Sequence, residues 1–364
     1  MSRPSPTPVT PSVRGRGARS NATSRFEARQ REAFDDGWTL EDPAPVQLTT
    51  TVLPDTARTI IARNASPDIP FDRSINPYRG CEHGCVYCYA RPAHAFLGHS
   101  PGLDFETKLY FKPEAARLLT AELSRKGYSP APIHIGGDTD PYQPLERRLR
   151  VTRQVLEVLD RFGHPCTLIS KSNLIVRDLD LLGPMAARGL ARAAISITSL
   201  DRRLARSMEP RAATPQRRLD AIRQLTAAGV PTTVMFAPVI PGLNDHELEA
   251  VLEAAAAAGA VSAGSIMVRL PLEIAGLFEE WLASDHPDRA ARVMSLIRQA
   301  RGGKVNSPEF GARMRGEGPI AELVASRLRA ARRRFGLDGA QTPLDVSQFR
   351  VPPKAGDQMD MFGG

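Results

Sequence analysis

The sequence has few cysteines and no apolar run long enough to span a membrane. It contains four cysteines in 364 residues, three of them within eight positions, and this is no pattern for a disulfide framework. No apolar stretch approaches the roughly 20 residues that a transmembrane helix requires. The arginines near the N-terminus are not followed by the apolar segment of a secretory signal. We therefore expect a cytoplasmic protein with no membrane contact.

Positive charge is in excess and is concentrated in two blocks. The net charge is +8, and residues 1–32 and 313–335 each contain seven arginines against two glutamates. Such blocks suit a polyanion such as DNA or RNA. An arginine-rich solvated surface is the alternative, and the composition does not separate the two.

Short β-rich runs alternate with helical patterns from about residue 131 onward. Strands are predicted at 132–137, 166–172, 193–199, 231–238 and 265–270, after an unclear first strand near 74–80. Helices are predicted at about 113–126, 147–162, 178–189, 214–229 and 244–259. Strand–helix units at this spacing build a parallel sheet with right-handed crossovers. The pattern fits a partial (β/α)6 TIM-like barrel, and a doubly wound sheet has the same local pattern.

The chain divides into four parts on this basis. Residues 1–57 form a basic, partly disordered extension, and residues 58–287 form the α/β core. Residues 288–338 contain two more helices, at about 288–301 and 319–335, and residues 339–364 form a flexible tail. Barrels and doubly wound sheets both place their chemistry at the carboxyl ends of the strands. This rule brings the cysteine segment together with residues 136–140, 171–172, 196–199, 238–245 and Arg269.

The segment NPYRGCEHGCVYCYARP carries the clearest chemical signal. It places Cys81, Cys85 and Cys88 in a C-x3-C-x2-C pattern, and three thiolates suit an iron–sulfur cluster with one iron left open for a substrate. Two alternatives remain at this point. The thiols could line a buried helix face, although the glycines of the run weaken this reading. They could also bind zinc with His83 or His94, although structural zinc sites usually use two separated ligand pairs.

The cysteine pattern, with Tyr87 before its last cysteine, resembles the radical S-adenosylmethionine (SAM) superfamily. The segments NPYRGC, TDPYQP-x-E (139–146), SITSLD (196–201), MEPRA (208–212) and PVIPGLND (238–245) resemble its spore photoproduct lyase-like branch, often labelled "DNA repair photolyase". The longer context is similar to a bacterial subgroup of unknown substrate. The resemblance implies a [4Fe–4S] cluster, SAM cleavage to a 5′-deoxyadenosyl radical, a reducing electron donor and a nucleic-acid substrate.

The resemblance also implies candidate SAM contacts. Gly136, Gly137 and Asp138 look like the superfamily's Gly-Gly-Glu motif, which meets the SAM amino group, and Asp140 is a rival acidic residue. A plain strand-exit turn is the structural alternative for the two glycines.

Further contacts are implied from three other loops. Lys171 and Ser196 are expected at the SAM carboxylate, and Ile240 is expected against the adenine ring. Glu209 and Arg217 are candidates for the ribose or for an ion pair between elements.

One departure from the branch limits the functional expectation. Spore photoproduct lyases carry a hydrogen-donating cysteine in the region matching residues 136–140, and this chain has none there. Cys166 lies at the start of a strand, which is the wrong end for a barrel site, and we interpret it as a small buried side chain. Repair of thymine dimers by that mechanism is therefore in doubt.

Two functions follow from these observations. The first is a radical SAM enzyme acting on a macromolecule, with nucleic acid favoured. The second is an iron–sulfur protein associated with nucleic acid, in which the cluster serves structure or redox sensing. In addition, Gln358–Phe362 (QMDMF) resembles the pentapeptide by which bacterial proteins dock onto the DNA sliding clamp.

Overall fold

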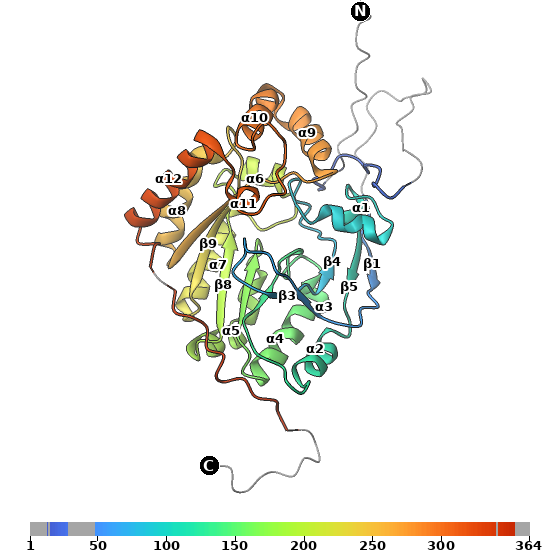
Figure 1. Ribbon diagram of the computed structural model, residues 1–364, viewed down its shortest axis with the longest axis vertical. Coiled ribbons are helices and arrows are strands. Elements are labelled where there is room, and N and C mark those ends of the chain that lie inside the picture. The colour runs from blue at the N-terminus through green and yellow to red at the C-terminus, as the bar shows by residue number, and fades with distance from the viewer. Residues whose placement is uncertain (1–12, 14, 28–47, 340, 354–364) are drawn as a thin grey trace, which may run out of the picture.

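The computed structural model describes residues 13, 15–27, 48–339 and 341–353 (Figure 1). Its strands are β1 (Thr51–Pro54), β2 (Ile61–Arg63), β3 (Arg73–Ile75), β4 (Tyr78–Arg79), β5 (Lys108–Phe111), β6 (Ile133–Ile135), β7 (Cys166–Ser170), β8 (Ala191–Ser196), β9 (Thr232–Val239) and β10 (Ser262–Met267).

Helices and 3-10 turns connect these strands. They are η1 (Arg91–Leu97), α1 (Asp104–Thr107), α2 (Ala115–Leu123), α3 (Glu146–Leu149), α4 (Val151–Arg161), η2 (Asn173–Asp178), α5 (Leu179–Ala187), α6 (Arg202–Met208), α7 (Pro215–Ala227), η3 (Asp245–Glu247), α8 (Leu248–Ala257), α9 (Ile274–Asp285), α10 (Pro287–Gln299), α11 (Ala312–Arg315) and α12 (Gly318–Arg334). No described helix combines the length and apolar character needed to cross a membrane.

The main sheet has seven strands in the order β10-β9-β8-β7-β6-β3-β2. The six strands from β3 to β10 pair in parallel, and β2 pairs antiparallel with β3 at one edge. The order runs in one direction along the chain, whereas a doubly wound sheet reverses its order at a switch point. The chain is therefore a partial (β/α)6 barrel, as the sequence predicts.

Burial alternates along the strands, as a two-residue period requires. In β7, Cys166, Leu168 and Ser170 are buried, whereas Thr167 and Ile169 are half-buried. Leu168 belongs to the core that helices such as α4 complete from outside. The half-buried side chains consequently line the inner face of the barrel.

Helix ends follow the expected capping chemistry. The side chain of Thr214 accepts a hydrogen bond from the Arg217 backbone, and Pro215 occupies the first turn of α7. Asp201 caps α6 in the same way. The sequence does not predict α6, α9 or the strands β1 and β5, because these elements are short or weakly periodic.

Both ends of the described chain pack more closely than the sequence predicts. Residues 15–27, the N-terminal strap, were assigned to a partly disordered extension, yet Ala18 is fully buried. Residues 341–353, the C-terminal strap, were assigned to a flexible tail, yet Phe349 packs against Tyr128 and Phe162. The expectations of disorder and flexibility are therefore wrong for these residues: fully buried Ala18 anchors the N-terminal strap, and half-buried Phe349 anchors the C-terminal strap. The Gln358–Phe362 motif lies outside the described residues.

Candidate active site at the cysteine loop

The three clustered cysteines lie in residues 80–89, the cysteine loop, which follows β4 above the carboxyl end of β3. Cys81 and Cys85 are buried, and Cys88 is partly buried. Burial raises the pKa of all three thiols, and the three lie near enough to influence one another. A buried thiol becomes a thiolate only beside a compensating positive charge, which a metal centre supplies.

The arrangement of the thiols fits a cluster better than a single zinc ion. Among the described residues, no three His, Cys, Asp or Glu side chains converge on one ion position. In a cluster each thiolate binds a separate iron, so convergence on one ion is not required. Each of the two histidines considered as zinc ligands has one ring nitrogen close to another group, although His83 Nδ1 makes no hydrogen bond. Nδ1 of His83 lies 3.3 Å from Asp140 Oδ2, and Nε2 of His94 lies 2.9 Å from the Lys108 carbonyl.

Glycine shapes the loop and excludes a helix through the cysteines. Gly80 and Gly84 have φ values of +74° and +67°, which other residues adopt at a cost. A Cβ atom on Gly84 would lie 2.6 Å from a carboxylate oxygen of Glu106. The loop therefore makes two tight turns, and the buried-helix alternative is wrong.

The segment 139–146 holds the cysteine loop from one side, and we call Thr139, Gln143 and Glu146 the socket. Gln143 accepts a hydrogen bond from the Glu82 backbone at 2.9 Å and donates to the Gly80 carbonyl at 3.2 Å. Thr139 donates to the Tyr78 carbonyl. Glu146 accepts a hydrogen bond from the Tyr78 hydroxyl at 2.5 Å. The socket residues thus hold Tyr78, which precedes the loop, and the backbone at the start of the loop.

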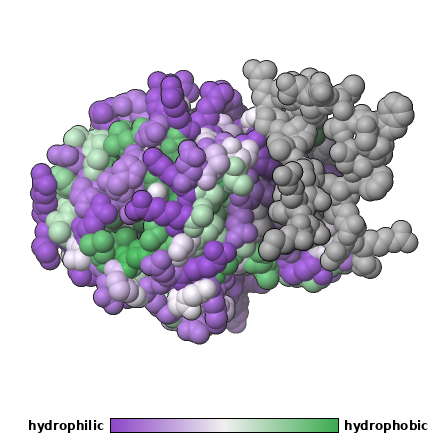
Figure 2. All heavy atoms as spheres, turned by 90° about the horizontal axis from the view of Figure 1, so that it is seen from above, coloured by the Kyte–Doolittle hydropathy of each residue, from purple (hydrophilic) through white to green (hydrophobic). Residues whose placement is uncertain are grey.

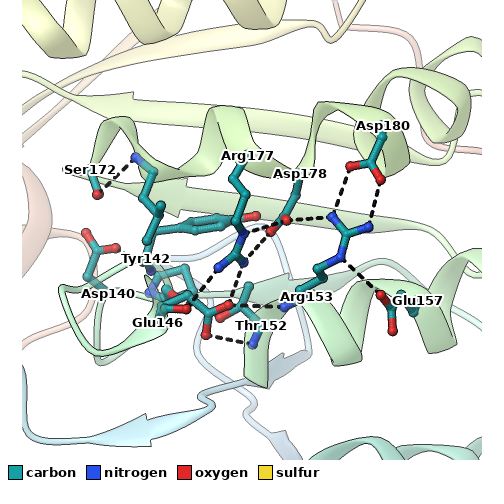
Figure 3. Close-up of polar contacts among 12 residues, drawn as sticks. Asp140, Tyr142, Glu146, Thr152, Arg153, Glu157, Ser172, Arg177, Asp178 and Asp180 are labelled. Atoms are coloured by element: carbon teal, nitrogen blue, oxygen red, sulfur yellow. Dashed lines mark hydrogen bonds and ion pairs between the residues drawn. The ribbon is translucent and has the colours of Figure 1, made fainter. Parts of the chain in front are cut away.

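The socket is itself braced by an ion-pair network (Figure 3). Arg177 donates to Glu146 at 2.7 Å and to Asp178 at 2.8 Å, and Arg153 joins Asp178 to Asp180. Glu146 and Asp178 are fully buried. Both carboxylates have their acceptor sites filled, as buried charges require.

The MEPRA segment holds the loop from a second side. The Val86 amide donates to the Met208 carbonyl at 3.0 Å, and Arg211 pairs with Glu82 at 3.1 Å. Buried Glu209 accepts hydrogen bonds from Tyr87 and Arg218. Glu209 therefore forms the ion pair between elements that the sequence left open, with Arg218 as its partner.

A third set of contacts joins the loop to the N-terminal strap. Fully buried Arg91 donates to the Cys85 carbonyl at 2.9 Å and pairs with Glu106 at 2.5 Å. The same carboxylate accepts hydrogen bonds from the Gly17 and Ala18 amides at 3.0 and 2.8 Å. Nothing in the sequence pattern marks Arg91 and Glu106, because Glu106 meets the strap across 89 and 88 positions.

The two acidic candidates for the SAM amino group differ in their surroundings. Asp140 accepts hydrogen bonds from Ser170 and from the Lys171 amide, both at 2.7 Å. Burial acts to raise the Asp140 pKa, but His83 and these hydrogen bonds outweigh it and lower the pKa to about 2. Asp138 is exposed, and one of its carboxylate oxygens has no partner within the described chain. Asp138 is therefore free to meet a ligand, whereas Asp140 ties β7 to the cysteine loop.

The glycines before Asp138 form a strand-exit turn. Gly136 has a φ of +98°, and a Cβ there would lie 2.7 Å from the Ile169 carbonyl. The carbonyl of Gly137 accepts a hydrogen bond from the Tyr89 hydroxyl. Tyr89 therefore joins the turn before Asp138 to the cysteine loop.

Lys171 and Ser196 lie where the sequence places them, at the carboxyl ends of β7 and β8. The Lys171 ammonium lies 5.8 Å from the Tyr87 ring centroid and makes no hydrogen bond to any described residue. Burial acts to lower its pKa, but Cys85 and Glu209 outweigh this effect, so Lys171 remains a cation. Ser196 is buried, and its carbonyl accepts a hydrogen bond from Arg218.

Ile240 does not fulfil its predicted role. Its side chain is fully buried in a cluster with Cys85, Tyr87 and Met208. It therefore presents no surface to an adenine ring, and we assign it to the core. The neighbouring Asn244 bonds the Ile240 amide and the Thr198 carbonyl, which joins the ends of β8 and β9.

Comparisons with known proteins agree with this geometry. The Radical SAM superfamily model matches residues 75–255. An uncharacterized protein of Mycobacterium tuberculosis is 35% identical over 289 residues, which cover 79% of this chain and 82% of the relative. A radical SAM Nα-GlyT isomerase of Pseudomonas phage M6 is 27% identical over 173 residues, covering 47% of this chain and 34% of the isomerase.

Solved structures extend the comparison to the fold. Spore photoproduct lyase complexed with a dinucleoside spore photoproduct superposes with a TM-score of 0.56 at 16% identity, covering 78% of this chain and 79% of the lyase. The chain belongs to the radical SAM superfamily and is an enzyme. Enzymes of this superfamily use a [4Fe–4S] cluster and SAM, and these are its cofactors.

Proposed function

We propose that Cys81, Cys85 and Cys88 each bind one iron of the [4Fe–4S] cluster and that the enzyme acts on nucleic acid. The observation that carries the cluster assignment is the position of two buried thiols and one partly buried thiol in a loop held from three sides. The cluster, when bound, supplies the electron that cleaves SAM. The socket, the MEPRA segment and Arg91 fix the loop so that the thiols meet the irons without rearrangement.

We assign the amino-acid end of SAM to opposite charges on neighbouring strands. Asp138 follows β6 and has a free carboxylate oxygen, and Lys171 follows β7 with a free ammonium. A carboxylate suits the SAM α-amino group, and an ammonium with the Ser196 hydroxyl suits its carboxylate.

Nucleic acid is favoured by unpaired positive charge on α12. Arg329, Arg333 and Arg334 are exposed and form no ion pair with a described residue. By contrast, described arginines of the N-terminal block are used internally: Arg16 is buried, and Arg19 pairs with Asp285. Arg16 and Arg19 are therefore not available to contact phosphates, contrary to the expectation for the N-terminal block. The exposed arginines of α12 are the candidates for that contact.

The function is tested by anaerobic reduction of the reconstituted protein with SAM, with and without DNA or RNA. We expect 5′-deoxyadenosine, and we expect faster formation in the presence of the correct nucleic acid. Cys166→Ala should behave as wild type, because Cys166 is buried in β7 away from the loop. A reduced cluster that binds SAM but never yields 5′-deoxyadenosine would favour a structural or redox-sensing cluster instead.

The tail motif Gln358–Phe362 supports a second, separate interaction with the DNA sliding clamp. It rests on the sequence alone. A fluorescent peptide of residues 352–364 should bind the clamp more tightly than millimolar, and replacing Gln358 and Phe362 by Ala should abolish binding. Equal binding of the two peptides would remove the proposal.

A further inference from the structure

Arg269 is a half-buried cation whose hydrogen-bond donors are unused. It follows β10 at the carboxyl end of the strand, two residues after Met267. Its guanidinium lies 4.5 Å from the centroid of the Tyr89 ring, and it forms no hydrogen bond or ion pair with any described residue. A charge in this position is costly without a partner. The donors of Arg269 are therefore available to a ligand.

The carboxylate near Arg269 is already bonded to other groups. Asp68 is the nearby carboxylate, and it accepts hydrogen bonds from the Gly311 amide at 2.6 Å and from Arg313 at 2.5 Å. Arg301, which is 3% exposed, donates to backbone carbonyls, including that of Val268 at 2.5 Å. Arg269 therefore lies near two other guanidiniums, and the Asp68 carboxylate is already bonded. Burial lowers the pKa of Arg269, and Arg313 acts in the same direction.

Tyr89 fixes the orientation of Arg269 across the mouth of the barrel. Tyr89 directly follows Cys88, and its hydroxyl donates to the Gly137 carbonyl beyond β6. Its ring remains 44% exposed, and Arg269 lies over it from the β10 side. A stacked guanidinium keeps its planar N–H edge free for two parallel bonds to phosphate oxygens. Arg269 is also close enough to Cys88, the third cysteine of the loop, for the two charges to interact.

We propose that Arg269 binds a backbone phosphate of the nucleic-acid substrate and so positions one nucleotide at the cysteine loop. This inference rests on the proposed function, because it takes nucleic acid as the substrate. A phosphate contact of this kind sets register and carries no sequence information. The SAM carboxylate has its own candidates, Lys171 and Ser196, on β7 and β8. Arg269 and Lys171 therefore serve two different anions.

The test compares Arg269→Ala, Arg269→Lys and the surface control Arg125→Ala in the reconstituted holoenzyme. Fluorescence anisotropy measures binding of labelled single-stranded DNA and RNA 20-mers over a series of salt concentrations, and calorimetry measures SAM binding. We expect Arg269→Ala to weaken nucleic-acid binding about tenfold or more and to reduce the salt slope by about one unit. Arg269→Lys should fall between, because it keeps the charge but loses the planar edge. Arg125→Ala should change affinity less, because Arg125 is solvated and precedes β6, at the amino end of the strands.

The outcomes distinguish a failure of this inference from a failure of the proposed function. Cluster absorbance and SAM affinity should be unchanged in Arg269→Ala. If SAM affinity falls and nucleic-acid affinity does not, Arg269 serves SAM and the inference is wrong. If nucleic-acid binding stays within twofold of wild type, the inference fails while the proposed function stands. If the wild-type enzyme binds neither DNA nor RNA at low salt, both fail, whatever the yield of 5′-deoxyadenosine.

Discussion

The polar residues that hold the cysteine loop and those that face the barrel mouth differ in how fully they are bonded. Glu146, Glu209 and Glu106 are buried, and each accepts several hydrogen bonds from the protein. Lys171 and Arg269 stand at strand ends with donors that no described residue uses. Charged groups whose hydrogen bonds are all made within the protein stabilise a fixed geometry, whereas those with unused donors can bind a ligand. We call Glu146, Glu209 and Glu106 the framework, and we call Lys171 and Arg269 the binding surface.

The largest effect is expected where the framework presents the metal ligands. Cys81→Ala, Cys85→Ala or Cys88→Ala should abolish the cluster, because each thiolate binds one iron and the loss of one leaves two irons without a protein ligand. Iron and sulfide analysis after anaerobic reconstitution measures this. Cys166→Ala should retain about four irons, and loss of the cluster in that variant would contradict the assignment.

The next largest effect is expected from the buried Arg91–Glu106 pair. Glu106→Gln should lower the unfolding free energy by about 3–5 kcal/mol, because it leaves a buried guanidinium unpaired. Urea denaturation of the apoprotein measures the change. Glu279→Gln, which breaks an exposed pair with Arg298, should cost no more than about 1 kcal/mol. Similar costs for the two variants would show that the framework is no more tightly bonded than the surface.

A smaller effect is expected where the N-terminal strap meets the loop. A Cβ atom on Gly17 would collide with the Gly84 carbonyl. We expect Gly17→Ala to cost about 1–3 kcal/mol and to speed the loss of cluster absorbance in air. Gly276→Ala is the matched control, because its Cβ meets nothing within 4 Å. An unchanged cluster lifetime in Gly17→Ala would show that the N-terminal strap does not help to hold the cysteine loop.

The smallest effect concerns pH and the far end of the barrel. Burial lowers the pKa of His164 to about 4 from 6.5, so the unfolded chain takes up the proton first as pH falls. The neutral imidazole stabilises the fold above pH 6.5, and this stability is lost between pH 6.5 and 4. From pH 7 to 5 His164 should account for a loss of about 2 kcal/mol. His94 and His134, whose pKa values burial also lowers to about 4, add to the total measured by urea denaturation. His164→Gln should flatten this dependence, and an unaltered slope would contradict the account.

The sequence predicted the barrel because strand periodicity and helix signals are local properties. It predicted the cysteine loop because the spacing is contained in eight residues. It could not separate Asp138 from Asp140, because only the folded chain shows that Ser170 and Lys171 already bond Asp140. The order in the two straps was missed for a related reason. Gly17 meets Glu106 across 89 positions, and no local pattern records such a contact.

The difference between framework and binding surface is tested most directly at Lys171. The measurement is the EPR spectrum of the reduced cluster, titrated with SAM, in wild type, Lys171→Ala and the surface control Lys126→Ala. The account predicts a full cluster in all three proteins and SAM affinity about tenfold or more weaker in Lys171→Ala alone. A Lys171→Ala protein that lacks the cluster, or one that responds to SAM as wild type does, would contradict it.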